Sequence, residues 1–127
     1  MARRLGDYGI SVYIAMHTVI ETTAYLRAAH DAGLNESERD AIVTMIANDP
    51  AAGDEIVGTG GCRKVRVAGR GKGKSGGYRL ITFFSGADIP VYLVTIFSKG
   101  QRSDLSAAER NGLAKFVRTL VNSHRKV

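Results

Sequence analysis

The sequence predicts an α+β domain, in which a small antiparallel sheet has two N-terminal helices and one C-terminal helix packed on it. Three observations predict this class. Two segments before residue 50 have apolar residues at helical spacing, three strand-like segments follow between residues 62 and 98, and a third amphipathic segment ends the chain. Strands and helices grouped in this way are typical of α+β domains. With a short strand at 17–21, the expected order is β-α-α-β-β-β-α.

The two N-terminal helices have recognisable ends. The first is expected to begin at residues 22–23, and Gly33 stops it. Asn35 and Glu38 form a capping pattern before the second helix. We expect this helix to end at Asn48, because the next residue precedes a proline and resists helical dihedral angles.

Three strands follow an expected loop at 51–61. Residues 62–68 alternate between apolar and basic side chains, and residues 78–84 and 91–98 are rich in β-branched and aromatic residues. We expect one sheet face to bury four residues against the helices: Val65, Val67, Ile81 and Phe83. The opposite face and its rim are then left for Lys64, Arg66 and the loop at 69–77.

The C-terminal helix is the clearest of the three. Ser106 and Glu109 form a capping box at its start. One apolar stripe follows at helical spacing: Leu113, Phe116, Val117, Leu120 and Val121. This stripe predicts a helix that packs on the sheet.

Composition limits the other possibilities. A chain of 127 residues is long enough for one domain, and no apolar run approaches the ~18–20 residues of a membrane span. The single cysteine, Cys62, excludes an internal disulfide and fits a reducing cytoplasm. The three histidines lie far apart, so we expect neither a metal site nor a cofactor. Residues 1–15 lack the features of a secretory signal, and we expect them to be a poorly ordered or appended extension before one domain at 16–127.

Positive charge is concentrated in one segment, residues 58–84, which we call the basic segment. It contains seven basic residues and no acidic one: Arg63, Lys64, Arg66, Arg70, Lys72, Lys74 and Arg79. The whole chain has 18 Lys+Arg and 12 Asp+Glu, a net charge of +6, so the rest of the chain sums to −1. Charge gathered in this way predicts binding to a polyanion rather than a role in solubility alone.

The spacing within the basic segment favours a nucleic acid. Lys64 and Arg66 would lie on one strand face about 7 Å apart, roughly the spacing of successive phosphates. The glycines at 69–77 would let the backbone approach a phosphate closely. The run at 68–75 nearly matches a nucleotide-binding P-loop, but Ala68 occupies its first glycine position and a strand, not a helix, follows. A nucleotide triphosphate is therefore disfavoured.

The segment and its surroundings closely resemble the RelE/HigB-like toxins of type II toxin–antitoxin systems, and most closely the HigB-like branch. The likeness runs from about Met16 to Val121. Its most specific motifs are GTGG-x-RK-x-R from Gly58, the GKGK-x-GG loop, and K-x-x-x-SDL from Lys99. Family members begin near Met16, which is therefore a candidate for the true start.

The resemblance implies a cytoplasmic toxin that cleaves messenger RNA in the ribosomal decoding site (the A site) without a metal and so inhibits translation. It also implies a cognate antitoxin, which we expect to carry a helix-turn-helix DNA-binding domain. Six residues are the implied catalytic candidates: Lys64, Arg66, Lys72, Lys74, Arg79 and Lys99. Five more are candidates for RNA binding: Arg63, Arg70, Tyr78, Phe97 and Arg102. Some relatives use a C-terminal tyrosine for base stacking; Ser106 stands near that position here, so Phe97, Tyr78 or the ribosome would have to substitute.

These residue types suit RNA cleavage, in which the 2′-hydroxyl is the nucleophile. The reaction needs a base, an acid for the leaving 5′-oxygen and cations for the developing phosphorane charge. Lys64, Lys72 or Lys74 could be the base, and the arginine forks suit phosphate oxygens. Two other functions remain open. The chain could be a non-catalytic RNA- or protein-binding member of the fold, or a gyrase poison like the ParE relatives.

Overall fold

The structure is a computed structural model that describes residues 17–69, 77–86, 88–102 and 104–125. The expected extension at 1–15 and the lysines of the GKGK loop lie outside these residues. The elements in chain order are β1 (Val19–Glu21), α1 (Thr23–Asp31), α2 (Glu36–Asn48), β2 (Asp54–Glu55), β3 (Cys62–Val67), β4 (Tyr78–Phe83), β5 (Val91–Ser98) and α3 (Ala107–Arg125). The predicted α+β class is confirmed.

The sheet has five strands in the order β1-β5-β4-β3-β2. Two details differ from the sequence prediction. β1 pairs with β5 in parallel, whereas the other pairs are antiparallel. The expected loop at 51–61 contains a short edge strand, β2, which pairs with Arg63 and Lys64 of β3. Both residues of β2 are exposed acids, so the sequence there carries no apolar alternation that would have predicted a strand.

The helices α1 and α2 begin where the sequence predicts. Thr22 caps α1: its Oγ1 accepts a hydrogen bond from the Tyr25 amide at 3.1 Å and donates one to the Leu93 carbonyl of β5 at 2.7 Å. The Asn35–Glu38 capping box opens α2, which ends at Asn48 as predicted. Side-chain capping therefore fixes where α1 and α2 begin.

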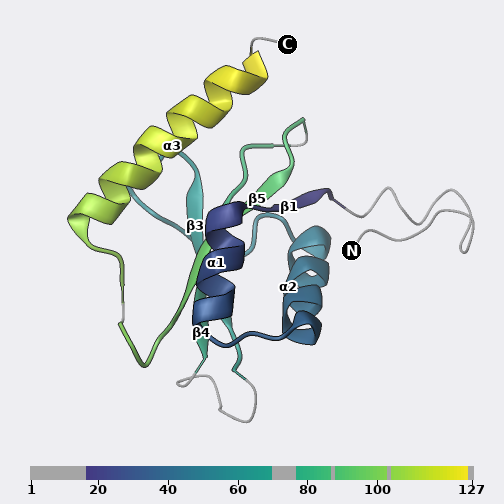
Figure 1. The fold of residues 1–127 in the computed structure, drawn as a ribbon. Coiled ribbons are helices and arrows are strands. Elements are labelled where there is room, and N and C mark those ends of the chain that lie inside the picture. The colour runs from purple at the N-terminus through teal and green to yellow at the C-terminus, as the bar shows by residue number, and fades with distance from the viewer. Residues whose placement is uncertain (1–16, 70–76, 87, 103, 126–127) are drawn as a thin grey trace, which may run out of the picture.

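Helices cover both faces of the sheet, with α1 and α2 on one side and α3 on the other (Figure 1). The first core lies under α1 and α2 and includes Tyr25, Ile46, Val65, Leu80 and Ile96. The second core lies under α3 and includes Cys62, Ile81, Phe83, Phe97 and Val117. Of the predicted apolar stripe of α3, Leu113 and Val117 are buried in this second core, and Phe116, Leu120 and Val121 pack against it.

The expectation that Val65, Val67, Ile81 and Phe83 share one face is wrong. In the β3–β4 register, Val65 lies opposite Leu80 and Lys64 lies opposite Ile81. Directly opposed residues of an antiparallel pair point to the same side, so Ile81 and Phe83 share the α3 face with Lys64 and Arg66. Burial alone cannot reveal this, because β4 is buried on both faces.

Candidate nucleic-acid interface

One row of side chains crosses three strands at the end of the sheet where β3 stops and β4 begins. Arg66 of β3 lies opposite Arg79 of β4, and Arg79 lies opposite Phe97 of β5. All three therefore point to the α3 face. Arg66 is exposed, whereas Arg79 is only 7% exposed and Phe97 only 6%. Lys64 lies on the same face one strand repeat away from Arg66. We call Lys64, Arg66 and Arg79 the cation cluster.

The two arginines of this cluster have no acidic partner. Among the residues that the structure describes, no carboxylate forms an ion pair with Arg66 or Arg79. Arg79 donates one long hydrogen bond, from Nη1 to the Tyr78 carbonyl at 3.4 Å. Like charges directly opposed across two strands repel, and burial of an unpaired cation is unfavourable. The arrangement therefore suits an anion that comes from another molecule.

Lys64 differs because it has a carboxylate partner. Its Nζ lies 3.2 Å from Oδ1 of Asp104, in the segment between β5 and α3. The same Oδ1 accepts the Leu105 amide at 2.7 Å, and this bond and the Lys64 ammonium hold the pKa of Asp104 below its usual value. With Arg110 and the two acids of β2, the pair lines a hollow of about 350 Å3. Sequence reasoning placed Asp104 in a motif but did not identify it as the partner of Lys64.

Arg102 is held over the row by two contacts. Its guanidinium carbon lies 4.3 Å from the centre of the Phe97 ring, and its Nη1 forms an ion pair with Glu109 Oε2. Glu109 is the acid of the predicted capping box, and its Oε1 accepts the Ser106 amide at 2.8 Å. The bonds from Arg102 and from Ser106 lower the pKa of Glu109. The first turn of α3 thus positions Arg102.

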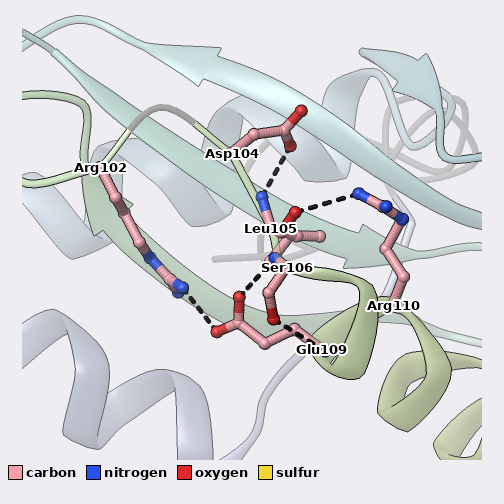
Figure 2. Close-up of polar contacts among 6 residues, drawn as sticks. All are labelled: Arg102, Asp104, Leu105, Ser106, Glu109 and Arg110. Atoms are coloured by element: carbon pink, nitrogen blue, oxygen red, sulfur yellow. Dashed lines mark hydrogen bonds and ion pairs between the residues drawn. The ribbon is translucent and has the colours of Figure 1, made fainter.

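Figure 2 shows how these contacts form one network around the start of α3. Arg102 points toward Glu109, and Glu109 accepts a hydrogen bond from the Ser106 amide. Arg110 Nη1 donates a hydrogen bond to the Leu105 carbonyl at 3.0 Å. Asp104 holds the Leu105 amide from the other side. The segment that carries Arg102 and Asp104 is therefore fixed to the helix.

The remaining predicted residues divide into three groups. Lys99 follows β5 at the same end of the sheet, and its amide donates to the Gly77 carbonyl at 3.0 Å. The other predicted basic residues of the loop, Arg70, Lys72 and Lys74, lie outside the described residues. Arg63 and Tyr78 belong to the opposite face, because they lie in register with Thr82 and Val67.

The last group does not join the cation cluster. Arg63 donates to the Gly53 carbonyl at 3.3 Å, close to the edge strand β2. Tyr78 packs against the first core and lines an apolar groove of about 240 Å3 with Leu34, Ile42 and Met45. The helix-covered sheet separates both residues from Arg66 and Arg79.

Other kinds of site find no support in the described part of the chain. No cluster of three His, Cys, Asp or Glu side chains that could hold a metal occurs there. Cys62 is fully buried, and burial raises the pKa of its thiol to about 11. No helix within the described ranges is long and apolar enough to cross a membrane.

Comparison with known proteins identifies a family and a similar fold. The family model described as the RelE toxin of the RelE/RelB toxin–antitoxin system matches residues 17–126. The structure of an arginine-to-alanine double mutant of the E. coli toxin RelE, in the free state, is similar with a TM-score of 0.51. The two chains are 16% identical, and the match covers 78% of this chain and 94% of that one. This structural likeness shows the fold.

Proposed function

Because the chain belongs to the RelE toxin family of RelE/RelB toxin–antitoxin systems, we propose that it is an endoribonuclease that cleaves messenger RNA in the ribosomal decoding site and so inhibits translation. One observation carries this proposal. Arg66 and Arg79 lie side by side on the α3 face with no carboxylate partner among the described residues, and Arg79 is almost completely buried. A phosphate of the RNA backbone supplies the missing negative charge.

The chemistry follows from the positions of the cations. The 2′-oxygen of the RNA forms a bond to the adjacent phosphorus and loses its proton to a base. The bond from phosphorus to the 5′-oxygen breaks, and this oxygen takes up a proton. Arg66 and Arg79 bind the two non-bridging oxygens, whose charge grows in the transition state. A 2′,3′-cyclic phosphate and a free 5′-hydroxyl are the products.

Lysines carry the proton transfers. Lys64 lies on the same face as the arginines, and its ammonium already bonds an anionic oxygen of Asp104. It is therefore placed to donate a proton to the leaving 5′-oxygen once the phosphate replaces Asp104. Lys72 and Lys74 remain candidates for the base, and Lys99, which follows β5, adds a further cation to the site. No step in this scheme uses a metal.

The family also defines the protein partner, since a RelE/RelB system pairs the toxin with a cognate antitoxin. We place this pair in the cytoplasm, where the ribosomes are, and expect the antitoxin to carry a helix-turn-helix DNA-binding domain. Within the family we assign the chain to the HigB-like branch, which its sequence resembles most.

The proposal is tested by inducing the wild type and the Arg79→Ala variant in cells and mapping new 5′ ends on translated messages. Arg27→Ala is the matched control, because Arg27 is an exposed arginine on α1, which packs on the opposite face. We expect wild type and the control to arrest growth and to produce new cuts in messages. We expect folded Arg79→Ala to produce no cuts. Arrest without cuts would contradict the nuclease and favour a binding module or a gyrase poison.

A further inference from the structure

Among the described residues, Arg102 is the cation near the row of Arg66, Arg79 and Phe97 whose guanidinium lies over an aromatic ring. The Phe97 ring lies 4.3 Å from its guanidinium carbon, and Glu109 holds its Nη1. The Arg102 side chain nevertheless remains 39% exposed. The guanidinium therefore has the Phe97 ring on one side, and the Arg102 side chain is partly open to another molecule.

The two aromatic residues expected to stack on a base are unsuitable for this role. Phe97 is 6% exposed, and Arg102 lies over its ring. Tyr78 belongs to the opposite sheet face and packs against the core under α1 and α2. An RNA base that approaches Arg66 and Arg79 meets the guanidinium of Arg102 before it can reach the Phe97 ring.

We propose that Arg102 is the base-stacking platform of this protein and that it reads a nucleobase next to the phosphate held by Arg66 and Arg79. Nucleobases of single-stranded RNA stack on arginine planes as well as on aromatic rings. Glu109 neutralises the charge of Arg102 and fixes its orientation, so this residue contributes a flat surface more than a phosphate contact. Glu109 and Ser106, which hold each other in the capping box, are positioning residues for Arg102.

This inference rests on the proposed RNA substrate, but binding can test it without cleavage. The probe is a short single-stranded RNA with 2′-O-methyl groups, which lack the nucleophile, and one fluorescent 2-aminopurine base. We expect wild type to quench the fluorescence, because stacking quenches this base. Arg102→Lys keeps the charge but loses the plane, so it should lose the quenching and bind about tenfold more weakly. The salt dependence of binding should stay unchanged.

An abasic RNA and a distant variant complete the experiment. When the stacked base is absent from the RNA, wild type and Arg102→Lys should bind equally well. Arg27→Lys, the same exchange on exposed α1, should behave as wild type with both RNAs. The proposal is overturned if Arg102→Lys quenches the fluorescence and binds RNA as well as wild type does, while the affinity of Arg102→Ala depends less steeply on salt concentration. Arg102 would then be a phosphate contact. Failure of wild type to bind this RNA, both free and in the decoding site of a ribosome, would instead overturn the proposed function.

Discussion

Lys64 and Asp104 are 40 residues apart in sequence, yet Nζ of the lysine lies 3.2 Å from Oδ1 of the aspartate. The ion pair joins β3 to the segment that leads into α3. Both side chains are substantially exposed, at 30% and 56%, so the pair contributes at most about 1 kcal/mol to stability. Lys64 therefore already has a carboxylate partner, as Arg102 has in Glu109, whereas Arg66 and Arg79 have none among the described residues.

Removal of the Asp104 charge should strengthen RNA binding. In Asp104→Asn, the Lys64 ammonium no longer has an anionic partner and becomes available to a backbone phosphate. Affinity for single-stranded RNA should rise. The slope of log affinity against log salt concentration, which we call the salt slope, should become steeper by up to about 0.7 log unit per decade, the value for one phosphate contact. Titrations at several salt concentrations measure both quantities. Weaker binding by the variant would show that Asp104 organises the site rather than competing for Lys64.

The position of Tyr78 gives a second prediction. Because Tyr78 packs on the face under α1 and α2, folded Tyr78→Leu, which removes the aromatic ring, should leave RNA affinity unchanged. Arg66→Ala, by contrast, should reduce the salt dependence of binding by about 0.7 log unit per decade. The same titrations compare the two variants. A loss of affinity in Tyr78→Leu that matches the loss in Arg66→Ala would place the RNA on both faces and contradict the site described here.

Much of this arrangement could be predicted from local sequence. Side-chain caps at Asn35 and Ser106 act within one helical turn, so their patterns give helix starts directly. The alternation in β4 likewise places Arg79 on the same face as Ile81 and Phe83, as the register confirms. These features depend on residues close in sequence, where spacing alone sets the geometry.

Features that depend on distant residues could not be predicted. The connection between β3 and β4 is too long to fix the register, so sequence did not reveal that Ile81 lies opposite Lys64. The parallel pairing of β1 with β5 joins segments about 70 residues apart. The Lys64–Asp104 and Phe97–Arg102 contacts depend on how the segment before α3 returns over the sheet.

The capping acid Glu109 should make stability depend on acidic pH. Its pKa in the folded state is lowered, first by Arg102 and then by the Ser106 amide, so its charge stabilises the fold above the unfolded value of about 4.3. This contribution is lost as the pH falls through the folded pKa. The free energy of unfolding of wild type should exceed that of Glu109→Gln by up to about 1 kcal/mol at pH 6, and the difference should shrink as the pH falls below the pKa of the unfolded carboxyl. Urea unfolding at several pH values measures this difference in stability. A difference that does not change with pH would contradict the ionic contact.

Cys62 should be inert in the folded protein. Its pKa of about 11 leaves about one thiol in a thousand ionised at pH 8, and its side chain is fully buried. A thiol reagent such as dithionitrobenzoate should therefore react only as fast as the domain opens. Complete reaction in urea is the control for reagent access, and rapid reaction without denaturant would show that the second core is open.

The most direct test of the central claim is the single-turnover cleavage rate on ribosomes that carry a message in the decoding site. Wild type should produce 2′,3′-cyclic phosphate ends there, and Arg79→Ala should cleave about 10²–10³ times more slowly because one transition-state donor is lost. Arg79→Lys should recover binding more fully than rate, because lysine keeps the charge without the fork. Equal rates for wild type and folded Arg79→Ala, or no cleavage by wild type, would contradict the assignment of Arg79 and its neighbours as a nuclease site.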